Sequence, residues 1–283
     1  MSSTTRTGAE LVREINETRV PYGMLAVWYL GQVSVVVKGS DAIVYIDPYL
    51  ASAPYRRYAP PLRPEEATNA DCVLITHEHI DHLDPDTVPT LAANRADTTF
   101  VAPAACHDMM RDFGVAAERI VTATTGEWLD LPGFRCKPIP AAHEELDEDP
   151  VLGHRFVGYI LDMNGVTFYH AGDTTIYPGL VETLRSESID VAMLPINGRD
   201  AFRRGRNILG NMNVREAAEL AAEAGIDTVI PCHYDMFEGN KERPGAFVDY
   251  LEEFYPGQKK HIMARFERYI YISDRALRGR EGA

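Results

Sequence analysis

The amino-acid sequence predicts an α/β protein made of two similar halves. In each half, short runs rich in Val, Ile and aromatic residues are followed by segments in which apolar residues recur every three to four positions. Side chains that bind metal ions come directly after several of the apolar runs. Because ligands gather at the strand ends of α/β sheets, these observations predict a sandwich with a metal site at one edge.

Five strands and two helices are predicted in the first half. The strands are rich in β-branched and aromatic residues and are bounded by Gly, Asp or Pro. They are expected at residues 24–30, 33–37, 42–46, 72–76 and 99–102. The helices are expected at 86–93 and 104–113.

The second half continues the pattern. Strands are expected at residues 134–141, 156–162, 166–169, 191–196, 228–232 and 261–266. Between the fourth and fifth of these strands, Asn213 and Glu216 have capping-box spacing before EAAELAAEA, and Gly225 stands where a helix ends, so a helix is predicted there. The segments 146–153 and 197–211 lack periodicity and are predicted to be loops.

Length and composition favour one soluble domain over residues 1–283, with a short helical extension at about 1–22. The chain is 45% hydrophobic and 25% charged, and no stretch approaches the roughly 18 to 20 apolar residues of a membrane span. The N-terminus lacks the apolar core of a signal peptide, and the four cysteines form no C-x-x-C pair. We therefore expect a cytoplasmic protein with reduced thiols and no membrane partner.

The net charge argues against a polyanionic partner. Lys and Arg number 28 against 42 Asp and Glu, which gives a formal net charge of −14. A surface of this sign repels nucleic acid, so none is expected as a partner. Part of the acidic excess is expected to be local, since a site that collects Asp side chains for cations adds negative charge that bound metal offsets.

Residues 76–82, THEHIDH, follow the apolar run CVLI and carry the chemistry of the chain. His77 and His79 are two residues apart, so in an extended segment their rings leave the backbone on the same side and can bind one ion. A turn after His79 would direct Asp81 and His82 toward a second ion, about 3.5 to 4 Å from the first. The segment therefore predicts a two-metal site.

Three further candidate ligands stand where later strands end. His143 follows CKPIPAA, Asp173 follows VTFYHAG and His233 follows TVIPC. His154 and Glu144 are alternatives to His143, because order and strand-end position alone support it. Strand ends that meet at one edge would bring these side chains to the THEHIDH segment.

These motifs resemble those of a known superfamily. THEHIDH is similar to the H-x-H-x-D-H signature of the metallo-β-lactamase superfamily, and YHAGDT and PCHY resemble its later bridging-Asp and terminal-His motifs. Asp47 in VYIDP resembles the first motif of the family, whose residue usually supports the ligands. The resemblance spans most of the chain and implies an αββα four-layer sandwich, with two sheets packed face to face and helices outside.

The resemblance also implies two divalent metal ions, with Zn or Mn expected from the imidazole and carboxylate ligands. It assigns His77, His79 and His143 to the first ion, Asp81, His82 and His233 to the second, and Asp173 to both as a bridge. Such a site predicts a hydrolase in which a metal-bridged hydroxide, formed at neutral pH, attacks the substrate. Asp81 is the expected catalytic residue, because it can orient the hydroxide or carry its proton.

A small anionic lactone or ester is the expected substrate. Within the superfamily, AVWYLGQVSVVVK, FYHAGDT, IDVAMLPING and VIPCHYDMF resemble the L-ascorbate-6-phosphate lactonase branch over roughly residues 24 to 240. Four arginines lie in the loop before the capped helix, namely Arg199, Arg203, Arg204 and Arg206. They are expected either to clamp a phosphate or carboxylate group of the substrate or to form a basic loop that faces solvent or another subunit. Tyr234 either donates to the oxyanion or packs at the sheet edge.

Two other functions stay open. A phosphodiesterase acting on a nucleotide or RNA uses the same two-metal geometry, although the acidic charge argues against RNA. A non-hydrolytic metal-binding or di-iron redox protein, as in the di-iron branch of the same fold, would need an electron donor. A homo-oligomer is expected, since such enzymes commonly assemble in this way.

Overall fold

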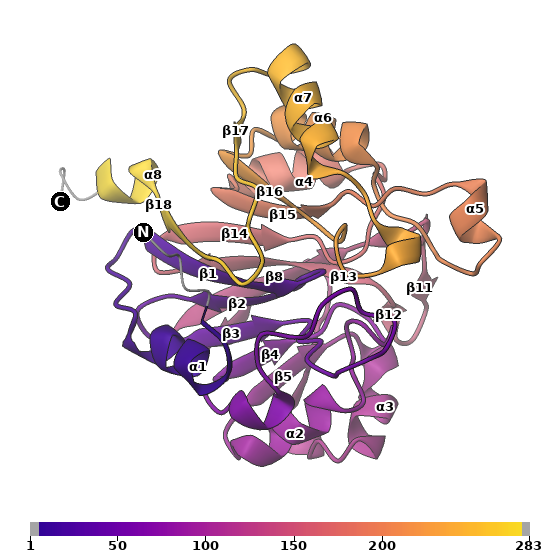
Figure 1. Cartoon of the computed structure of the whole chain (residues 1–283). Coiled ribbons are helices and arrows are strands. Elements are labelled where there is room, and N and C mark those ends of the chain that lie inside the picture. Colours follow the sequence, from indigo (N-terminus) through magenta and orange to yellow (C-terminus); the bar gives the residue numbers. More distant parts are fainter. Residues whose placement is uncertain (1–5, 279–283) are drawn as a thin grey trace.

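Two seven-stranded β-sheets pack face to face, and helices cover the outer face of each sheet (Figure 1). This architecture is seen in a computed structural model that describes residues 6–278. The αββα sandwich predicted above is therefore confirmed. Each sheet is mixed, with antiparallel pairing at one side and parallel pairing at the other.

The first half of the chain and one late strand form the first sheet. Its strands are β1 (Met24–Gly31), β2 (Ser34–Lys38), β3 (Ile43–Ile46), β4 (Cys72–Leu74), β5 (Thr99–Ala102), β6 (Ile120–Thr122) and β18 (Arg268–Ile272). Their order is β18-β1-β2-β3-β4-β5-β6, and the pairs from β3 to β6 are parallel. The central strands are buried nearly throughout, as expected for a sheet that is covered on both faces.

The second sheet comes from the second half. Its strands are β7 (Leu129–Leu131), β8 (Phe134–Pro140), β13 (Val157–Met163), β14 (Val166–His170), β15 (Val191–Pro195), β16 (Thr228–Cys232) and β17 (Lys259–Lys260). Their order is β17-β16-β15-β14-β13-β8-β7, and the pairs from β14 to β17 are parallel. Two short hairpins lie between β8 and β13: β9 (Ala142–His143) with β10 (Glu145–Leu146), and β11 (Glu148–Asp149) with β12 (Gly153–His154).

Each outer face is covered by its own helices. The helices α1 (Gly8–Glu17), α2 (Thr87–Asn94) and α3 (His107–Asp112) pack on the first sheet. The helices α4 (Leu180–Glu187), α6 (Val214–Ala224) and α7 (Pro244–Phe254) pack on the second sheet. The remaining helices are α5 (Ala201–Arg204), α8 (Asp274–Arg278) and the 3-10 turns Pro64–Glu66, Ala104–Cys106, Ala117–Arg119 and Glu238–Asn240.

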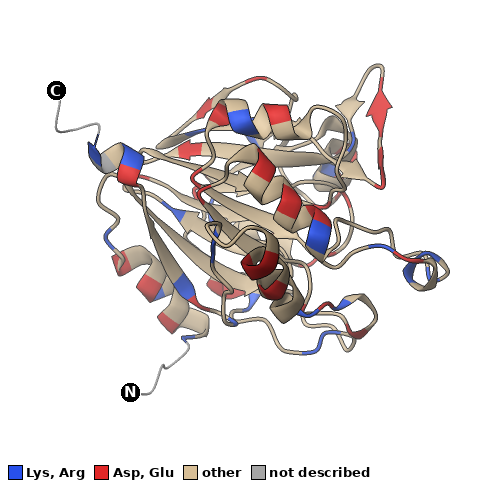
Figure 2. Ribbon diagram, turned by 90° about the horizontal axis from the view of Figure 1, so that it is seen from above, with Lys and Arg blue, Asp and Glu red and all other residues tan. Residues whose placement is uncertain are grey.

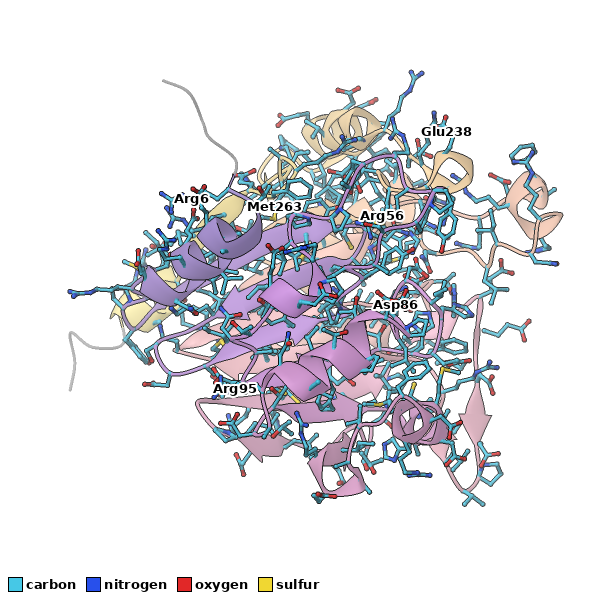
Figure 3. All side chains as sticks on the ribbon, turned by 60° about the horizontal axis from the view of Figure 1, so that its bottom comes forward. Arg6, Arg56, Asp86, Arg95, Glu238 and Met263 are labelled. Carbon is cyan, nitrogen blue, oxygen red and sulfur yellow. The ribbon has the colours of Figure 1, made fainter. Side chains whose placement is uncertain are left out.

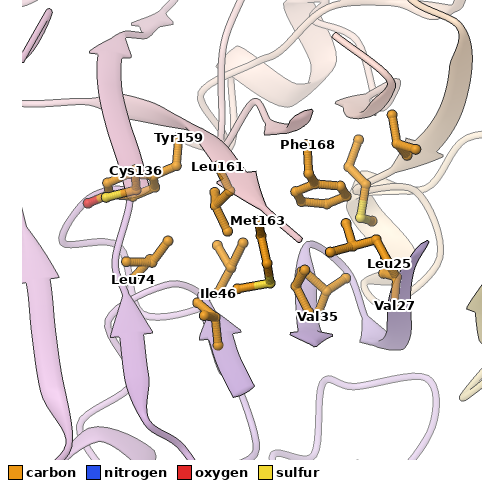
Figure 4. Close-up of a cluster of buried hydrophobic side chains, with 14 of the residues drawn as sticks. Leu25, Val27, Val35, Ile46, Leu74, Cys136, Tyr159, Leu161, Met163 and Phe168 are labelled. Carbon is orange, nitrogen blue, oxygen red and sulfur yellow. The ribbon is translucent and has the colours of Figure 1, made fainter. Parts of the chain in front are cut away.

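The largest core lies between the two sheets. Leu25, Val35 and Leu74 from the first sheet meet Leu161 and Phe168 from the second, and all five side chains are fully buried (Figure 4). Alternate residues of the same strands point outward into the helix layers. This dense core holds the strand ends in fixed positions, which is the condition for a precise metal site.

The capped helix forms as predicted. The Asn213 side chain accepts a hydrogen bond from the Glu216 backbone N–H at 3.0 Å, and the Glu216 carboxylate accepts one from the Asn213 N–H at 2.9 Å. Gly225 ends α6 in the left-handed conformation, with φ of 71°. Both ends of α6 therefore follow from the local sequence.

Replacing Asn213 with Ala is expected to lower the free energy of unfolding by about 1 kcal/mol, because the helix loses its N-cap acceptor. Urea unfolding checks this value. Arg215→Ala removes an exposed side chain from the same helix, which pairs with Glu219, and serves as the control with an expected loss of about 0.5 kcal/mol or less. Equal losses in the two variants would contradict the capping role.

The structure corrects several predicted boundaries. Residues 261–266 are not a strand, because this segment carries the chain from β17 in the second sheet to β18 in the first and turns at Phe266, whose φ is 62°. The predicted loops 197–211 and 146–153 contain α5 and parts of the short hairpins. The helix in the predicted extension 1–22 is α1, and residues 1–5 of that extension lie outside the described residues.

Three features bear on where the protein is expected to act: its helices, its surface charge and its cysteines. Within residues 6–278, no helix has the length and apolar character needed to cross a membrane. Acidic residues are distributed over several of the helices, whereas α5 carries basic residues and projects from the body (Figure 2). The four cysteines are buried as free thiols.

Candidate metal centre

The candidate ligands gather at one edge of the sandwich. His77, His79, Asp81 and His82 lie in the loop that follows β4. Three later ligands come from the second half of the chain: His143 ends β9 in the short hairpin after β8, whereas Asp173 follows β14 and His233 directly follows β16 of the second sheet. Because β4, β14 and β16 are parallel strands of facing sheets, their carboxyl ends deliver these residues to one place.

The first group of candidate ligands contains three histidines. The Nε2 atom of His77 lies 2.9 Å from Nδ1 of His79. His77, His79 and His143 each offer one ring nitrogen, and these three nitrogen atoms lie within 4.8 Å of one another. The structure thus brings His143, rather than His154 or Glu144, to the pair of histidines in the motif.

Asp173 lies between the two groups of histidines. One carboxylate oxygen, Oδ2, is 3.6 Å from Nε2 of His143 and 3.2 Å from Nε2 of His233. The other oxygen, Oδ1, is 3.6 Å from Nε2 of His82. Asp81 completes the second group, since its Oδ2 lies 3.7 Å from Nε2 of His233. All seven predicted ligands therefore surround one space.

The residues present fit bound metal. Nε2 of His82 and Oδ1 of Asp173 are buried and have no hydrogen-bond partner. A buried polar atom without a hydrogen-bond partner lowers the stability of the fold. These two atoms lie 3.6 Å apart, and a cation bound by both would satisfy them. Imidazole nitrogens and carboxylate oxygens are ligands of divalent transition metals.

Asp47 and Thr76 fix the orientation of His82. The Asp47 carboxylate lies 2.7 Å from Nδ1 of His82, and it accepts hydrogen bonds from the backbone N–H and the hydroxyl of Thr76 at 2.8 and 2.7 Å. Nε2 of His82 is thereby directed into the site. Such partners set the tautomer and the direction of metal-binding histidines.

Gln32 also supports the site, although the sequence did not single it out. It lies in the turn between β1 and β2 with φ of 59° and is completely buried. Its side-chain NH₂ donates to the Asp81 carboxylate at 3.2 Å and contacts the His233 ring at 3.1 Å. A lone amide within the apolar hairpin LGQVSVVV was the signal available in the sequence.

The two groups of histidines differ in pKa. Burial lowers the pKa values of His77, His79 and His143 below the usual range of histidine. Burial has the same effect on His82 and His233, but the nearby carboxylates, Asp173 first and then Asp81, together with Asp47 beside His82, raise both pKa values. The first group is therefore neutral at pH 7, the form in which imidazole binds metal.

We expect metal to leave in two steps as the pH falls. A raised pKa means that protons compete with metal at a higher pH, so the group of Asp81, His82 and His233 should release its ion first. The group of His77, His79 and His143 should hold its ion to lower pH. Metal content after dialysis between about pH 8 and about pH 5 checks the order. A single step with simultaneous loss would contradict it.

A cavity of about 790 Å³ opens onto the site. Five of the candidate ligands line it, namely His79, Asp81, His143, Asp173 and His233. Its walls come from three segments, at residues 54–57, 207–209 and 237–240. A volume of this size fits a small molecule.

The predicted substrate-binding residues lie elsewhere. None of Arg203, Arg204, Arg206 and Tyr234 lines this cavity. The guanidinium of Arg203 bonds Asp200, Asn240 and the Lys241 carbonyl. An ion pair at 3.0 Å joins Arg204 to Glu144, the Arg206 guanidinium stacks on Phe202, and Tyr234 is buried against the second helix layer.

The arginines that do line the cavity are Arg56 and Arg57, which the sequence analysis missed. Arg57 pairs with Glu238 at 3.2 Å. Arg56 donates to the carbonyls of Tyr49, Ala51 and Tyr58, and its Nη2 atom is buried without a partner. Figure 3 shows Arg56 and Glu238 on the same side of the molecule.

The sequence from β3 to the last ligand matches a known family. The profile of the β-lactamase superfamily domain covers residues 43–234, a range that includes all seven candidate ligands. The chain belongs to the metallo-β-lactamase superfamily. A UPF0173 metal-dependent hydrolase from Pyrococcus furiosus is 32% identical over 235 residues, which are 81% of this chain and 93% of that protein.

Solved structures share the superfamily fold. A metallo hydrolase from Ignicoccus hospitalis superposes with a TM-score of 0.68 at 23% identity, over 88% of this chain and 98% of its own. The diiron β-hydroxylase CmlA from Streptomyces venezuelae superposes with a TM-score of 0.66 at 15% identity, over 90% of this chain and 55% of CmlA. At these identities the likeness concerns the fold alone.

Membership in the UPF0173 family makes this chain a metal-dependent hydrolase of the metallo-β-lactamase superfamily. The name of the relative from P. furiosus gives no substrate. The predicted likeness to the ascorbate phosphate lactonase branch therefore stays a prediction.

Proposed function

We propose that the protein hydrolyses a small anionic lactone or ester with the help of two divalent cations, Zn or Mn. The observation that carries the proposal is the convergence of seven imidazole and carboxylate groups, five of which line a cavity that also has Arg56 in its wall. We further propose that the protein acts in the cytoplasm as a homo-oligomer.

Arg56 supports the anionic character of the substrate. Among residues 6–278, no carboxylate lies within 4.0 Å of its guanidinium, which bonds only neutral carbonyl groups. A cation that is partly buried without a counter-ion favours a negatively charged ligand nearby. A carboxylate or phosphate group of the substrate can supply this charge from the cavity.

The reaction depends on residues that hold the site in place. The seven ligands would hold two divalent cations, and such cations would make hydroxide available at neutral pH by lowering the pKa of water toward about 7. Asp81 accepts or returns the proton, and the Gln32 amide holds its carboxylate at 3.2 Å. His82 keeps its direction because Asp47 accepts its Nδ1 proton.

A screen of the purified protein tests the proposal. Metal is removed with a chelator, Zn or Mn is restored, and hydrolysis is measured on a panel of lactones, esters, thioesters and bis(p-nitrophenyl) phosphate. We expect metal-restored hydrolysis of lactones or esters and a preference for anionic members. Cleavage of the phosphodiester with no lactone or ester cleaved would favour the phosphodiesterase. Iron in the purified protein together with oxidase activity would favour the di-iron alternative.

The role of Arg56 has its own comparison. Arg56→Gln is expected to raise KM for an anionic ester about 10-fold or more relative to its neutral methyl ester, because a charge-assisted hydrogen bond is lost. Arg203→Ala, at the residue first predicted to clamp the anion, should not change this preference. An equal change for the two esters in Arg56→Gln would remove the proposed anion contact.

A further inference from the structure

Part of the cavity wall is apolar, and this part adjoins Arg56. Its apolar lining consists of Pro54, Tyr55, Ile80, Ile208, Leu209 and Phe237. Three of these side chains are unusually exposed for their type, namely Tyr55 at 53%, Ile80 at 53% and Leu209 at 42%. Exposed apolar side chains that line one cavity indicate a binding site.

Two segments of this wall hold each other in place. A backbone bridge joins Arg56 to Phe237, and the Arg57 N–H donates to the Met236 carbonyl at 2.9 Å. The Tyr55 and Phe237 rings pack at 5.9 Å. The apolar wall is therefore preorganised and does not depend on a ligand to form it.

The third segment belongs to the loop that carries α5. Its Ile208 N–H bonds the Arg203 carbonyl at 3.0 Å, and the Arg203 side chain reaches Asn240 in the 237–240 segment at 3.1 Å. Arg203 thus ties the segment that contains Leu209 to the 237–240 segment from outside the cavity. This gives Arg203 a structural role at the cavity wall.

The apolar wall, the basic group of Arg56 and several metal ligands line the same cavity. Ile80 stands between the ligands His79 and Asp81, so the apolar surface begins at the metal centre itself. A molecule that places its reacting bond over Asp173 and its anion near Arg56 must lay the rest of its body on this wall. A sugar phosphate, which is polar throughout, would leave the wall exposed to water.

We infer that the substrate is amphipathic: an anionic lactone or ester whose body is an alkyl or aryl group seated on Tyr55, Leu209 and Phe237. This inference rests on the proposed function, since it describes the substrate class of that site. A protein partner on this wall is the alternative occupant. It would also be expected to cover Phe202, which is 61% exposed and outside the cavity.

Two series of compounds test the inference with the metal-loaded protein. The first is hydrolysis of γ-butyrolactone, γ-octalactone and γ-dodecalactone, in which kcat/KM should rise by up to about 4-fold for each methylene that the wall buries. The second is calorimetric binding of acetate, butyrate and octanoate, which requires no hydrolysis and should show a falling Kd along the series.

Two matched variants test whether the apolar wall causes the chain-length dependence. Leu209→Ser should flatten both chain-length series, because it removes apolar surface from the wall. Leu152→Ser changes a residue that is 49% exposed in the β11–β12 hairpin and does not line the cavity, so it should leave both series as in the wild type. Thermal unfolding of the two variants excludes a general loss of structure.

The outcomes separate this inference from the function on which it rests. The inference is supported if the wild type shows chain-length dependence and Leu209→Ser reduces that dependence. Lactones that are hydrolysed with no dependence on chain length, or a Leu209→Ser protein that keeps the full dependence, would overturn it and leave the proposed function intact. If the affinity for alkanoates rises with chain length while no lactone or ester is hydrolysed, the proposed function alone is overturned.

Discussion

Asp173→Asn is expected to remove metal from the protein and to lower kcat/KM by about 1000-fold, equivalent to ~4 kcal/mol of transition-state stabilisation. The Asp173 carboxylate lies between His82, His143 and His233, at 3.2 to 3.6 Å from each. An amide of the same shape supplies no charge to hold cations there. Metal analysis and steady-state kinetics measure both effects.

A second buried aspartate provides the control for this variant. Asp190 is 7% exposed, pairs with Arg275 at 2.7 Å and contacts none of the candidate ligands. Asp190→Asn should lower stability while metal content and kcat/KM stay near the wild-type values. If Asp173→Asn keeps its metal and its activity, Asp173 does not bridge the site.

Asp47→Asn is expected to weaken metal binding 10- to 100-fold, the usual effect of removing a partner that orients a metal-binding histidine. The Asp47 carboxylate is completely buried and lies 2.7 Å from Nδ1 of His82. An amide can present its NH₂ group to that nitrogen and so favour the wrong tautomer, which turns a proton toward the metal side. Titration of the metal-free protein with Zn measures the change in affinity.

Asp84 gives the matched comparison for Asp47. It is 1% exposed, and it accepts hydrogen bonds from Thr87 and the Ala51 N–H, so its contacts organise a loop and touch no ligand. Asp84→Asn should lower the melting temperature without weakening metal binding. An equal loss of metal affinity in the two variants would mean that Asp47 acts only through the stability of the fold.

The sequence predicted the parts of the molecule whose information is local. β1 to β5 and β13 to β16 were predicted from runs of β-branched residues, and α6 from its capping box. The spacing of His77, His79, Asp81 and His82 predicted that one loop presents all four side chains together. The ends of strands supplied His143, Asp173 and His233, because parallel strands finish at a common edge.

Features that depend on distant contacts were not predictable in the same way. β18 pairs with β1 across most of the chain, and its alternating burial gives a weak signal because one face is exposed. The arginines of residues 199–206 were predicted either to clamp an anion or to form a solvated or subunit-facing loop, and the sequence did not indicate that Glu216, Asp200 and Glu144 pair with three of them. Conversely, Arg56 stands in the irregular segment APYRRYAP, where nothing local indicates that it enters the cavity wall.

The central claim is that seven side chains from distant stretches of the chain hold two cations together. A crystal structure of the Mn- or Zn-loaded protein with anomalous scattering tests it most directly. The account predicts two peaks about 3.5 to 4 Å apart, one beside His77, His79 and His143, one beside Asp81, His82 and His233, and Asp173 between them. Well-ordered protein with anomalous peaks only at other places would contradict it.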